Sequence, residues 1–290
     1  MSQPTPSLSR SPGAPEATVD LHLHSTASDG LVPPAEVVRQ AVSAGLSGIA
    51  LTDHDTVDGI AEAMAEAERH GLDFLHGAEL SANEPGRSIH LLAYGFDITD
   101  GNLLAFFEAY GVDRRRRAGA MVDRLRGLGV RISYEDVAEF SGAAAPTRAH
   151  VARALVGRGQ VTNEEEVFRR FLSRGRPGYV SKRPTPPAEV IRLVHDAGGV
   201  VLLAHPGRIH RTPDVRRWVA DGLDGVEIRH PNNRPSVRQR MRDLVAELGL
   251  LRSGGSDWHG PGSRRFEIGC EAVPRAWMLE IRARCRALVS

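Results

Sequence analysis

The chain has 290 residues, enough for one large α/β domain or two smaller ones. Its 37 basic and 36 acidic residues give a net charge of +1, so charge does not point to stable binding of duplex DNA or of a membrane surface. No stretch is long and apolar enough to cross a bilayer. Residues 1–17, rich in proline and serine, are predicted to be a disordered tail without the apolar core of a signal peptide. We therefore expect a cytoplasmic protein.

The two cysteines, Cys270 and Cys285, lie near the C-terminus and lack the spacing of a thiolate metal site. We expect both to be free, buried thiols in a reducing compartment.

Beyond the tail, short apolar strands alternate with helices. The predicted strands are residues 19–24, 48–52, 74–79, 89–94, 199–204, 225–228 and 250–253. The predicted helices are residues 34–44, 57–70, 187–197, 214–220 and 236–248. A turn at 84–86 joins the third and fourth strands, and residues 102–182 are predicted to form several helices without a convincing strand.

This alternation predicts a parallel sheet with right-handed crossovers, closed or nearly closed into a small seven-stranded α/β barrel. The barrel would be built from residues 18–101 and 183–290, and residues 102–182 would be a helical insertion between its fourth and fifth strands.

Histidines and carboxylates gather at the ends of the predicted strands. The segments concerned are Asp20–His24, Thr52–Asp55, Ala204–Pro206 and Gly255–His259. In an α/β barrel the residues that carry the chemistry lie at the carboxyl ends of the strands. Residues two apart on a strand point to the same face, so His22 and His24 can reach one ion, and Asp20 could orient one of these imidazoles.

Two further acids, Asp29 and Asp55, have a structural explanation that competes with a functional one, and a third, Glu79, does not. Asp29 lies in a Ser-Asp-Gly segment, where aspartate is also an ordinary turn residue. Asp55 or Thr56 is expected to cap the following helix. Glu79 ends the third strand, and a glutamate buried there would need a partner such as a cation.

Together these segments predict a metal centre with nitrogen and oxygen ligands, which suit Mn, Fe or Zn. Six histidines and three carboxylates are too many for one ion and suffice for two or three. The predicted ligands are His22, His24, Asp29, His54, Glu79, His90, His205, Asp257 and His259. Clustered ions make a bound water acidic and hold the attacking and leaving oxygens of a displacement, which suits phosphoester hydrolysis.

These residues resemble the polymerase and histidinol phosphatase (PHP) family of metal-dependent phosphoesterases. The resemblance rests on four motifs in the family's order: His22-x-His24, Asp53-His54, His205-Pro206 and Asp257-x-His259, with Glu79 and His90 between the second and third. The helical insertion is similar to the branch of nucleoside 3′,5′-bisphosphate phosphatases and 5′-to-3′ exoribonuclease-like enzymes.

The resemblance implies a distorted (β/α)7, TIM-like barrel with a trinuclear site. It also implies a partition of the ligands. His22, His24, Glu79 and Asp257 would hold one ion; Glu79, His90 and His205 a second; and Asp29, His54 and His259 a third.

A phosphate substrate also needs cations for the oxygens that the metals do not bind. Candidate phosphate contacts are Arg148, Lys182, Arg183, Arg208 and His230. Arg148 precedes a predicted helix in a segment similar to an Arg-x-His element of the bisphosphatase branch. The run Arg114–Arg117 is expected to be a solvated helix face, and its alternative role is a basic rim that guides RNA.

The sequence therefore predicts a hydrolase that removes a terminal phosphate from a small phosphorylated nucleotide, such as a nucleoside 3′,5′-bisphosphate. His205 or His230 would help to protonate the leaving oxygen. One alternative is stepwise hydrolysis of a short RNA from its 5′ end. A second is hydrolysis of a C–N or carboxylic ester bond, although no lysine follows a strand to bridge two ions. A third is a non-catalytic binding domain, which the full ligand set argues against.

Overall fold

The structure, a computed structural model, describes residues 17–207, 211–262 and 266–289. Residues 1–16 of the predicted tail and the predicted phosphate contact Arg208 lie outside these ranges. The strands are β1 (Thr18–Leu23), β2 (Gly48–Leu51), β3 (Asp73–Glu84), β4 (Arg87–Tyr94), β5 (Val200–Leu203), β6 (Gly225–Arg229), β7 (Leu251–Gly254) and β8 (Val273–Pro274). Among the helices of the described ranges, none has the length and apolarity needed to cross a bilayer.

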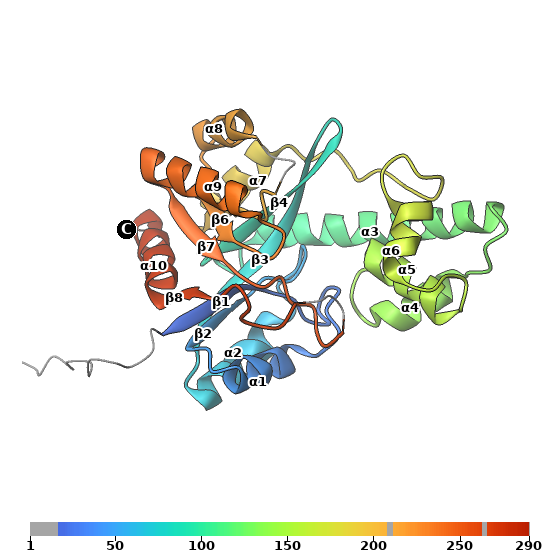
Figure 1. Ribbon diagram of the computed structural model, residues 1–290, viewed down its shortest axis with the longest axis horizontal. Coiled ribbons are helices and arrows are strands. Elements are labelled where there is room, and N and C mark those ends of the chain that lie inside the picture. The colour runs from blue at the N-terminus through green and yellow to red at the C-terminus, as the bar shows by residue number, and fades with distance from the viewer. Residues whose placement is uncertain (1–16, 208–210, 263–265, 290) are drawn as a thin grey trace, which may run out of the picture.

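Helices cover the sheet and also form a separate lobe (Figure 1). Around the sheet lie α1 (Pro34–Ser43), α2 (Ile60–His70), α7 (Pro187–Asp196), α8 (Thr212–Ala220), α9 (Pro235–Leu248) and α10 (Arg275–Val289). The lobe is formed by the second half of α3 (Gly101–Gly127) together with α4 (Tyr134–Ser141), α5 (Arg148–Gly157), α6 (Glu164–Val167) and the π-helix η1 (Phe168–Leu172).

The eight strands form one sheet in the order β7-β6-β5-β4-β3-β2-β1-β8. Strands β1 to β3 are parallel to one another, as are β5 to β7. The expected all-parallel sheet is wrong at β4, which runs antiparallel to both β3 and β5. The reason is the two-residue turn Pro85–Gly86: a connection this short permits only a hairpin, whereas a parallel pair needs a crossover of a dozen or more residues.

The segment after β7 brings the two ends of the sheet together. The Asp257 amide donates to the His22 carbonyl at 3.0 Å, and the His24 amide donates to the Trp258 carbonyl at 3.0 Å. These bonds continue the ladder from β7 onto β1 and nearly close the barrel. The predicted TIM-like barrel is thus confirmed, with an eighth short strand, β8, that pairs antiparallel with β1 and was not predicted.

The lobe has a hydrophobic core of its own. Met121 and Leu125 of α3 pack there with Val151 and Leu155 of α5, and all four side chains are nearly or fully buried. The first half of the 27-residue helix α3 belongs instead to the barrel core, through Phe106 and its neighbours. One continuous helix therefore carries the lobe and fixes it to the barrel.

Cys285 is free and buried, as expected, but Cys270 is exposed, so the expectation of two buried thiols is wrong for that residue.

Gly255 lies where the barrel closes, and we predict that it tolerates no side chain. A Cβ atom there would come within 2.5 Å of the His22 backbone nitrogen and Cβ. Gly255→Ala should therefore lower the free energy of unfolding by about 1–3 kcal/mol, measured by urea denaturation. Gly119 of α3 is the control, since a Cβ added there would meet no neighbouring atom within 4 Å. Gly119→Ala should leave stability unchanged or raise it by up to about 1 kcal/mol. Equal stabilities of the two variants would contradict the prediction.

Candidate metal centre

The candidate ligands meet at one edge of the barrel, where the parallel strands end and antiparallel β4 begins. His24 follows β1, His54 follows β2, and His205 follows β5. The backbone of His54 also forms an isolated parallel β-bridge with that of Glu79 in β3. His90 lies near the start of β4, and the reversed direction of that strand brings it to the same edge.

The backbone at these strand ends adopts an unusual conformation. Asp55, His205 and Asp257 have positive φ angles of 51°, 26° and 53°. Non-glycine residues rarely adopt this region, and the strain costs about 1–3 kcal/mol per residue. The surrounding fold keeps all three residues in this conformation. The chain therefore leaves the strand direction at the edge where the site lies.

Glu79 is the central carboxylate of the site. It is 1% exposed and is surrounded by five imidazoles. Their nearest nitrogens lie at 2.7 Å (His90 Nδ1), 2.8 Å (His205 Nε2), 3.1 Å (His54 Nδ1), 3.2 Å (His22 Nε2) and 3.3 Å (His24 Nε2) from a carboxylate oxygen. A single carboxylate that reaches so many imidazoles has the geometry of a bridging ligand.

Asp257 forms a second junction. Its Oδ1 lies 3.2 Å from His24 Nε2 and 3.6 Å from His22 Nε2, and its Oδ2 lies 3.3 Å from His230 Nε2. His230, 0% exposed, is thus held inside the site rather than at a surface.

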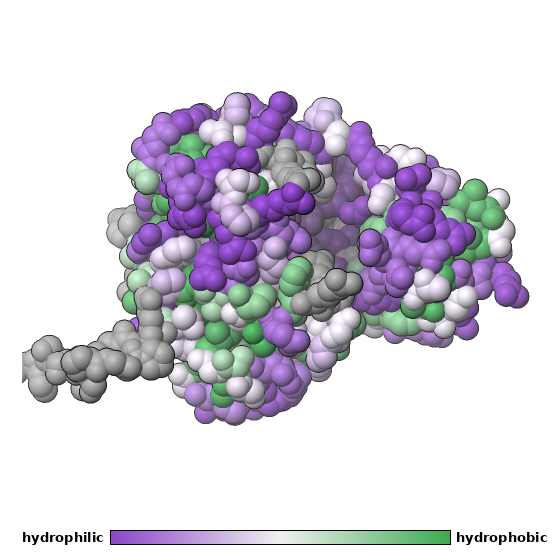
Figure 2. Space-filling model, in the orientation of Figure 1, coloured by the Kyte–Doolittle hydropathy of each residue, from purple (hydrophilic) through white to green (hydrophobic). Residues whose placement is uncertain are grey.

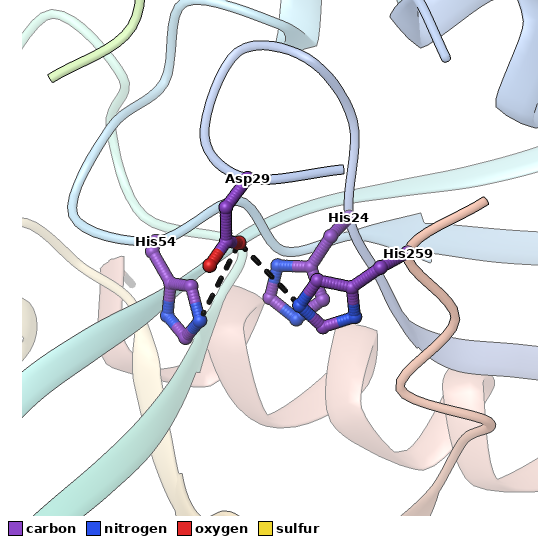
Figure 3. Close-up of side chains that lie close together, drawn as sticks. All are labelled: His24, Asp29, His54 and His259. Atoms are coloured by element: carbon purple, nitrogen blue, oxygen red, sulfur yellow. Dashed lines mark ion pairs between the residues drawn. The ribbon is translucent and has the colours of Figure 1, made fainter. Parts of the chain in front are cut away.

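Asp29 forms a third junction, on the loop between β1 and α1 (Figure 3). Its Oδ1 lies 3.4 Å from His259 Nε2 and 3.8 Å from His54 Nε2. The His24 ring lies beside the rings of these two histidines. The ring centroids of His24 and His259 are 4.1 Å apart. The turn at Asp29 therefore carries a carboxylate into the site.

Several buried polar atoms here make no hydrogen bond. They are both ring nitrogens of His24, Oδ1 of Asp29, Nδ1 of His54, and Nε2 of His230 and His259. Leaving such atoms buried and unbonded is costly, and a cation among them removes the cost. Their ligand atoms fall into groups within 4.8 Å of one another, namely His24–Asp29–His54–His259, His22–His24–Glu79–Asp257, His22–Glu227–His230 and His54–Glu79–His90. The residues present therefore fit divalent cations with nitrogen and oxygen ligands.

The protonation states of four candidate ligands favour this fit. Burial opposes ionisation of Glu79 and Asp29, but the surrounding imidazoles outweigh it and hold the pKa of each carboxyl well below its usual range. Burial also lowers the pKa of His54 to about 3 and of His90 to about 4, so both rings are neutral. Ionised carboxylates and neutral imidazoles are the forms that bind a cation. His24 differs: burial lowers its pKa, but the carboxylates of Asp257 and Glu79 outweigh this and raise it to about 9, so this ring has to lose a proton when a cation binds.

Glu227 of β6 is a residue of the site that the sequence analysis did not single out. It is 0% exposed, and its Oε1 lies 2.9 Å from His22 Nδ1. Its Oε2 accepts a hydrogen bond of 2.5 Å from the His205 amide. Glu227 thus orients His22 so that Nε2 faces Glu79 and Asp257. Its place on the inner face of a predicted strand, three residues before His230, was the available signal.

The expectation that Asp20 orients an imidazole is wrong. Its carboxylate accepts hydrogen bonds from the backbone amides of His22, Ser256 and Gly269 and from Ser256 Oγ. Asp20 therefore holds the segment that closes the barrel. Asp53 has a similar role, since it accepts hydrogen bonds from Ser25 and Ser28 at the base of the Asp29 loop.

The expected helix cap at Asp55 or Thr56 is also wrong. Helix α2 begins at Ile60, and its N-cap, Gly59, makes no side-chain cap. Asp55 instead accepts a 2.6 Å hydrogen bond from the Ser81 amide and forms an ion pair with Arg114 of α3.

The Arg114–Arg117 run is not a uniformly solvated face. The side chains of Arg114 and Arg117 are only 11% and 6% exposed. Arg117 donates to the Val180 carbonyl at 3.1 Å, while Arg115 and Arg116 are exposed. The expectation fails for two of the four because α3 packs between barrel and lobe and buries one side of the run.

Comparison with known proteins decides the family. The PHP domain family matches residues 20–171. The chain is 37% identical to a 5′-3′ exoribonuclease of Haemophilus influenzae, over 83% of this chain and 90% of that one. It is 33% identical to a 3′,5′-nucleoside bisphosphate phosphatase of Chromobacterium violaceum, over 87% and 91%. The chain belongs to the PHP domain family.

Solved structures agree with this PHP assignment. A crystal structure of a candidate metal-dependent phosphoesterase from Bifidobacterium adolescentis superposes with a TM-score of 0.87 and 34% identity, over 92% of this chain and 96% of that one. A C. violaceum protein named as an amidohydrolase, with bound sulfate and no metal, superposes with a TM-score of 0.84 and 31% identity. The match covers 92% of this chain and 97% of that one. The predicted family and its enzyme class, the metal-dependent phosphoesterases, are confirmed.

A basic cleft adjoins the PHP metal centre. It has a volume of about 620 Å³ and lies between the β3–β4 hairpin and the lobe. Its basic side chains are Arg87, Arg117, Arg148, Arg174 and Lys182, and Glu84, which pairs with Arg87, also lines it. Burial lowers the pKa of Lys182 to about 7, so an anion in the cleft would favour its charged form. Figure 2 shows that the molecule is hollowed between barrel and lobe and that the surface there is mostly hydrophilic.

Two predicted phosphate contacts line this cleft. The Arg148 guanidinium lies 5.7 Å and 5.9 Å from the ring centroids of Phe168 and Tyr179. Lys182 Nζ lies 3.5 Å from His90 Nε2 and also donates to Ser81 Oγ and Ser88 Oγ. Arg183, in contrast, stacks over the Tyr110 ring, with its guanidinium 5.4 Å from the centroid.

We predict that Glu227 tunes metal affinity through His22. Glu227→Gln keeps the size of the side chain but removes the negative charge that makes the imidazole a stronger donor. Loss of such an outer partner weakens metal binding by about 10–100-fold. Titration of the metal-free protein with Mn²⁺ measures this. The control is Glu280→Gln, which removes a surface partner of Arg252. Equal Mn²⁺ affinities of the two variants would rule out this role.

Proposed function

We propose that this PHP protein removes a terminal phosphate from a small nucleotide, with a nucleoside 3′,5′-bisphosphate as the favoured substrate. The observation that carries the proposal is the position of a basic cleft beside the carboxylate–imidazole cluster: Lys182 touches both, through His90. A bisphosphate needs a reaction centre for one phosphate and separate cations for the other. The relative named as a 3′,5′-nucleoside bisphosphate phosphatase supports this substrate class.

The proposed centre holds two or three divalent ions, Mn, Fe or Zn. The ligands proposed for the first ion are His22, His24, Glu79 and Asp257, which form one of the compact groups. The second would use Glu79, His90 and His205, whose two imidazoles both approach Glu79 Oε1. The third would use Asp29, His54 and His259. Bound ions would supply Lewis acidity to the phosphoryl oxygens and to a water.

The protein's own residues would bind the substrate and move protons. Arg148 and Lys182 would contact the phosphate that is not hydrolysed. His230 is proposed as the proton donor to the leaving oxygen, and His205 would take this role only if its Nε2 does not bind the second ion. Burial disfavours the charged form of His205, but its hydrogen bond to Glu79 outweighs this and raises the pKa above the usual value. The sulfate bound by the C. violaceum structure supports a tetrahedral anion as ligand.

A second candidate is 5′-to-3′ hydrolysis of a short RNA end, which the relative from H. influenzae favours by its name. The cleft also favours it, because about 620 Å³ lies within the range of pockets that hold whole small molecules and leaves room beyond one phosphate. Both activities would use the same centre. Arg183 and the exposed Arg115 would then guide the strand.

The central prediction is a metal-dependent phosphatase activity. The protein should release inorganic phosphate from adenosine 3′,5′-bisphosphate in the presence of Mn²⁺, and EDTA should abolish the release. His22→Ala and Asp257→Ala should reduce kcat by at least about 10³-fold, since each removes a ligand from the shared centre, while circular dichroism shows a folded protein. A short 5′-phosphorylated RNA, a carboxylic ester and an amide are assayed in parallel. No phosphate release with any divalent metal would refute the proposal.

A further prediction concerns the cations of the cleft. Arg148→Ala and Lys182→Ala should each raise KM for the bisphosphate by about 10–100-fold, because a hydrogen bond to a charged group contributes about 1.5–3 kcal/mol. The effect should be smaller for a monophosphate. Arg170→Ala is the matched control, since this arginine is exposed in the lobe and pairs with Glu166. An unchanged KM in the first two variants would remove these residues from the site.

A further inference from the structure

Thr147 is a residue of the lobe that contacts the proposed third metal group directly. Its Oγ1 donates a hydrogen bond of 3.2 Å to Asp29 Oδ2, across 118 residues of sequence. The same hydroxyl accepts hydrogen bonds from the amides of Ala149 (3.1 Å) and His150 (3.4 Å), as the N-cap of α5. A hydroxyl has one proton and two lone pairs. Since the lone pairs face the helix, the proton is directed at Asp29.

The hydrogen bond from Thr147 determines which carboxylate oxygen of Asp29 remains available to a cation. Thr147 occupies Oδ2, while Oδ1 makes no hydrogen bond and faces His54 and His259. Asp29 is only 6% exposed, so little water can take the place of the hydroxyl. Without the hydroxyl, the carboxylate could rotate about its last bond and present Oδ1 elsewhere.

The position of Thr147 is set by the lobe and not by the barrel. The Thr147 amide donates to Nδ1 of His150 at 3.0 Å, which completes a capping box. His150 is 1% exposed, and Val151 and Leu155 of the same helix lie fully buried in the core of the lobe. The packing of α5 therefore determines where the hydroxyl stands.

We propose that Thr147 is a positioning residue that makes binding of the third ion depend on docking of the lobe; this rests on the metal centre proposed above. Asp29 supplies the ligand oxygen, and Thr147 holds it in the orientation that faces the two imidazoles. The next residue, Arg148, lines the basic cleft, so one turn of α5 serves both the third ion group and the phosphate cleft. A protein whose lobe is displaced would keep the first two ion groups and lose the third.

The test is the number and affinity of bound ions, measured without turnover. Thr147→Val keeps the shape of the side chain and removes the hydroxyl. Titration of the metal-free protein with Mn²⁺ should show one ion bound about 10–100-fold more weakly, and the others unchanged. Thr147→Ser keeps donor and cap and should bind all ions within about threefold of the wild type. At limiting Mn²⁺ the Val variant should lose kcat, and excess Mn²⁺ should restore it.

Ser133→Ala is the matched control, because Ser133 caps α4 of the same lobe by the same kind of capping box. Losing a cap costs about 1 kcal/mol in either variant, so both should stay folded with similar unfolding temperatures. If Thr147→Val does not fold, Thr147→Ala is measured in its place. If neither variant folds, Thr147 has a structural role and the proposal is overturned.

Wild-type Mn²⁺ affinities in Thr147→Val, or an equal loss in Ser133→Ala, would also overturn it. If instead the wild type bound Mn²⁺ but released no phosphate, the proposed function would fail while the role of Thr147 could still be read from the titration.

Discussion

The fold depends on burying Glu79 among imidazoles without leaving uncompensated charge. This carboxylate is almost inaccessible, and five histidine rings lie within 3.3 Å of its oxygens. Desolvating so many polar groups is unfavourable unless each finds a partner. Some are paired by the protein, as His22 is by Glu227. Other imidazole and carboxylate atoms of the candidate ligand groups make no hydrogen bond, so groups that destabilise the metal-free protein would stabilise the metal-bound one.

The strands bring these polar groups together because they end at one edge of the barrel. Two features of the backbone place the remaining side chains there. Antiparallel β4 turns its first residues toward that edge, which is how His90 reaches Glu79 although it lies near the start of a strand. Positive φ angles at His205 and Asp257 turn the chain sharply just where their side chains enter the site. Such strain persists only where the surroundings enforce it, and here the hydrogen bonds of Glu227 and of the barrel closure do so.

The lobe is part of the site and not an appendage. Arg114 of α3 pairs with Asp55, Thr147 of α5 holds Asp29, and Arg148 and Lys182 line the cleft beside the metal centre. A separate hydrophobic core lets the lobe set these positions as a unit, while the length of α3 ties it to the barrel. The lobe therefore contributes to the geometry of the site, while the barrel carries most of the candidate metal ligands.

The sequence by itself determined the family, the barrel and a set of nine candidate ligands, because strand patterning and His-x-His or Asp-x-His spacing are local properties of the chain. It left the ligand roles and the phosphate contacts as predictions. Tertiary structure alone decided that Glu227 and not Asp20 supports His22, and that Arg114 and Thr147 reach the site. Each of these depends on contacts between segments far apart in the chain, and no local pattern encodes which buried polar group will meet which partner.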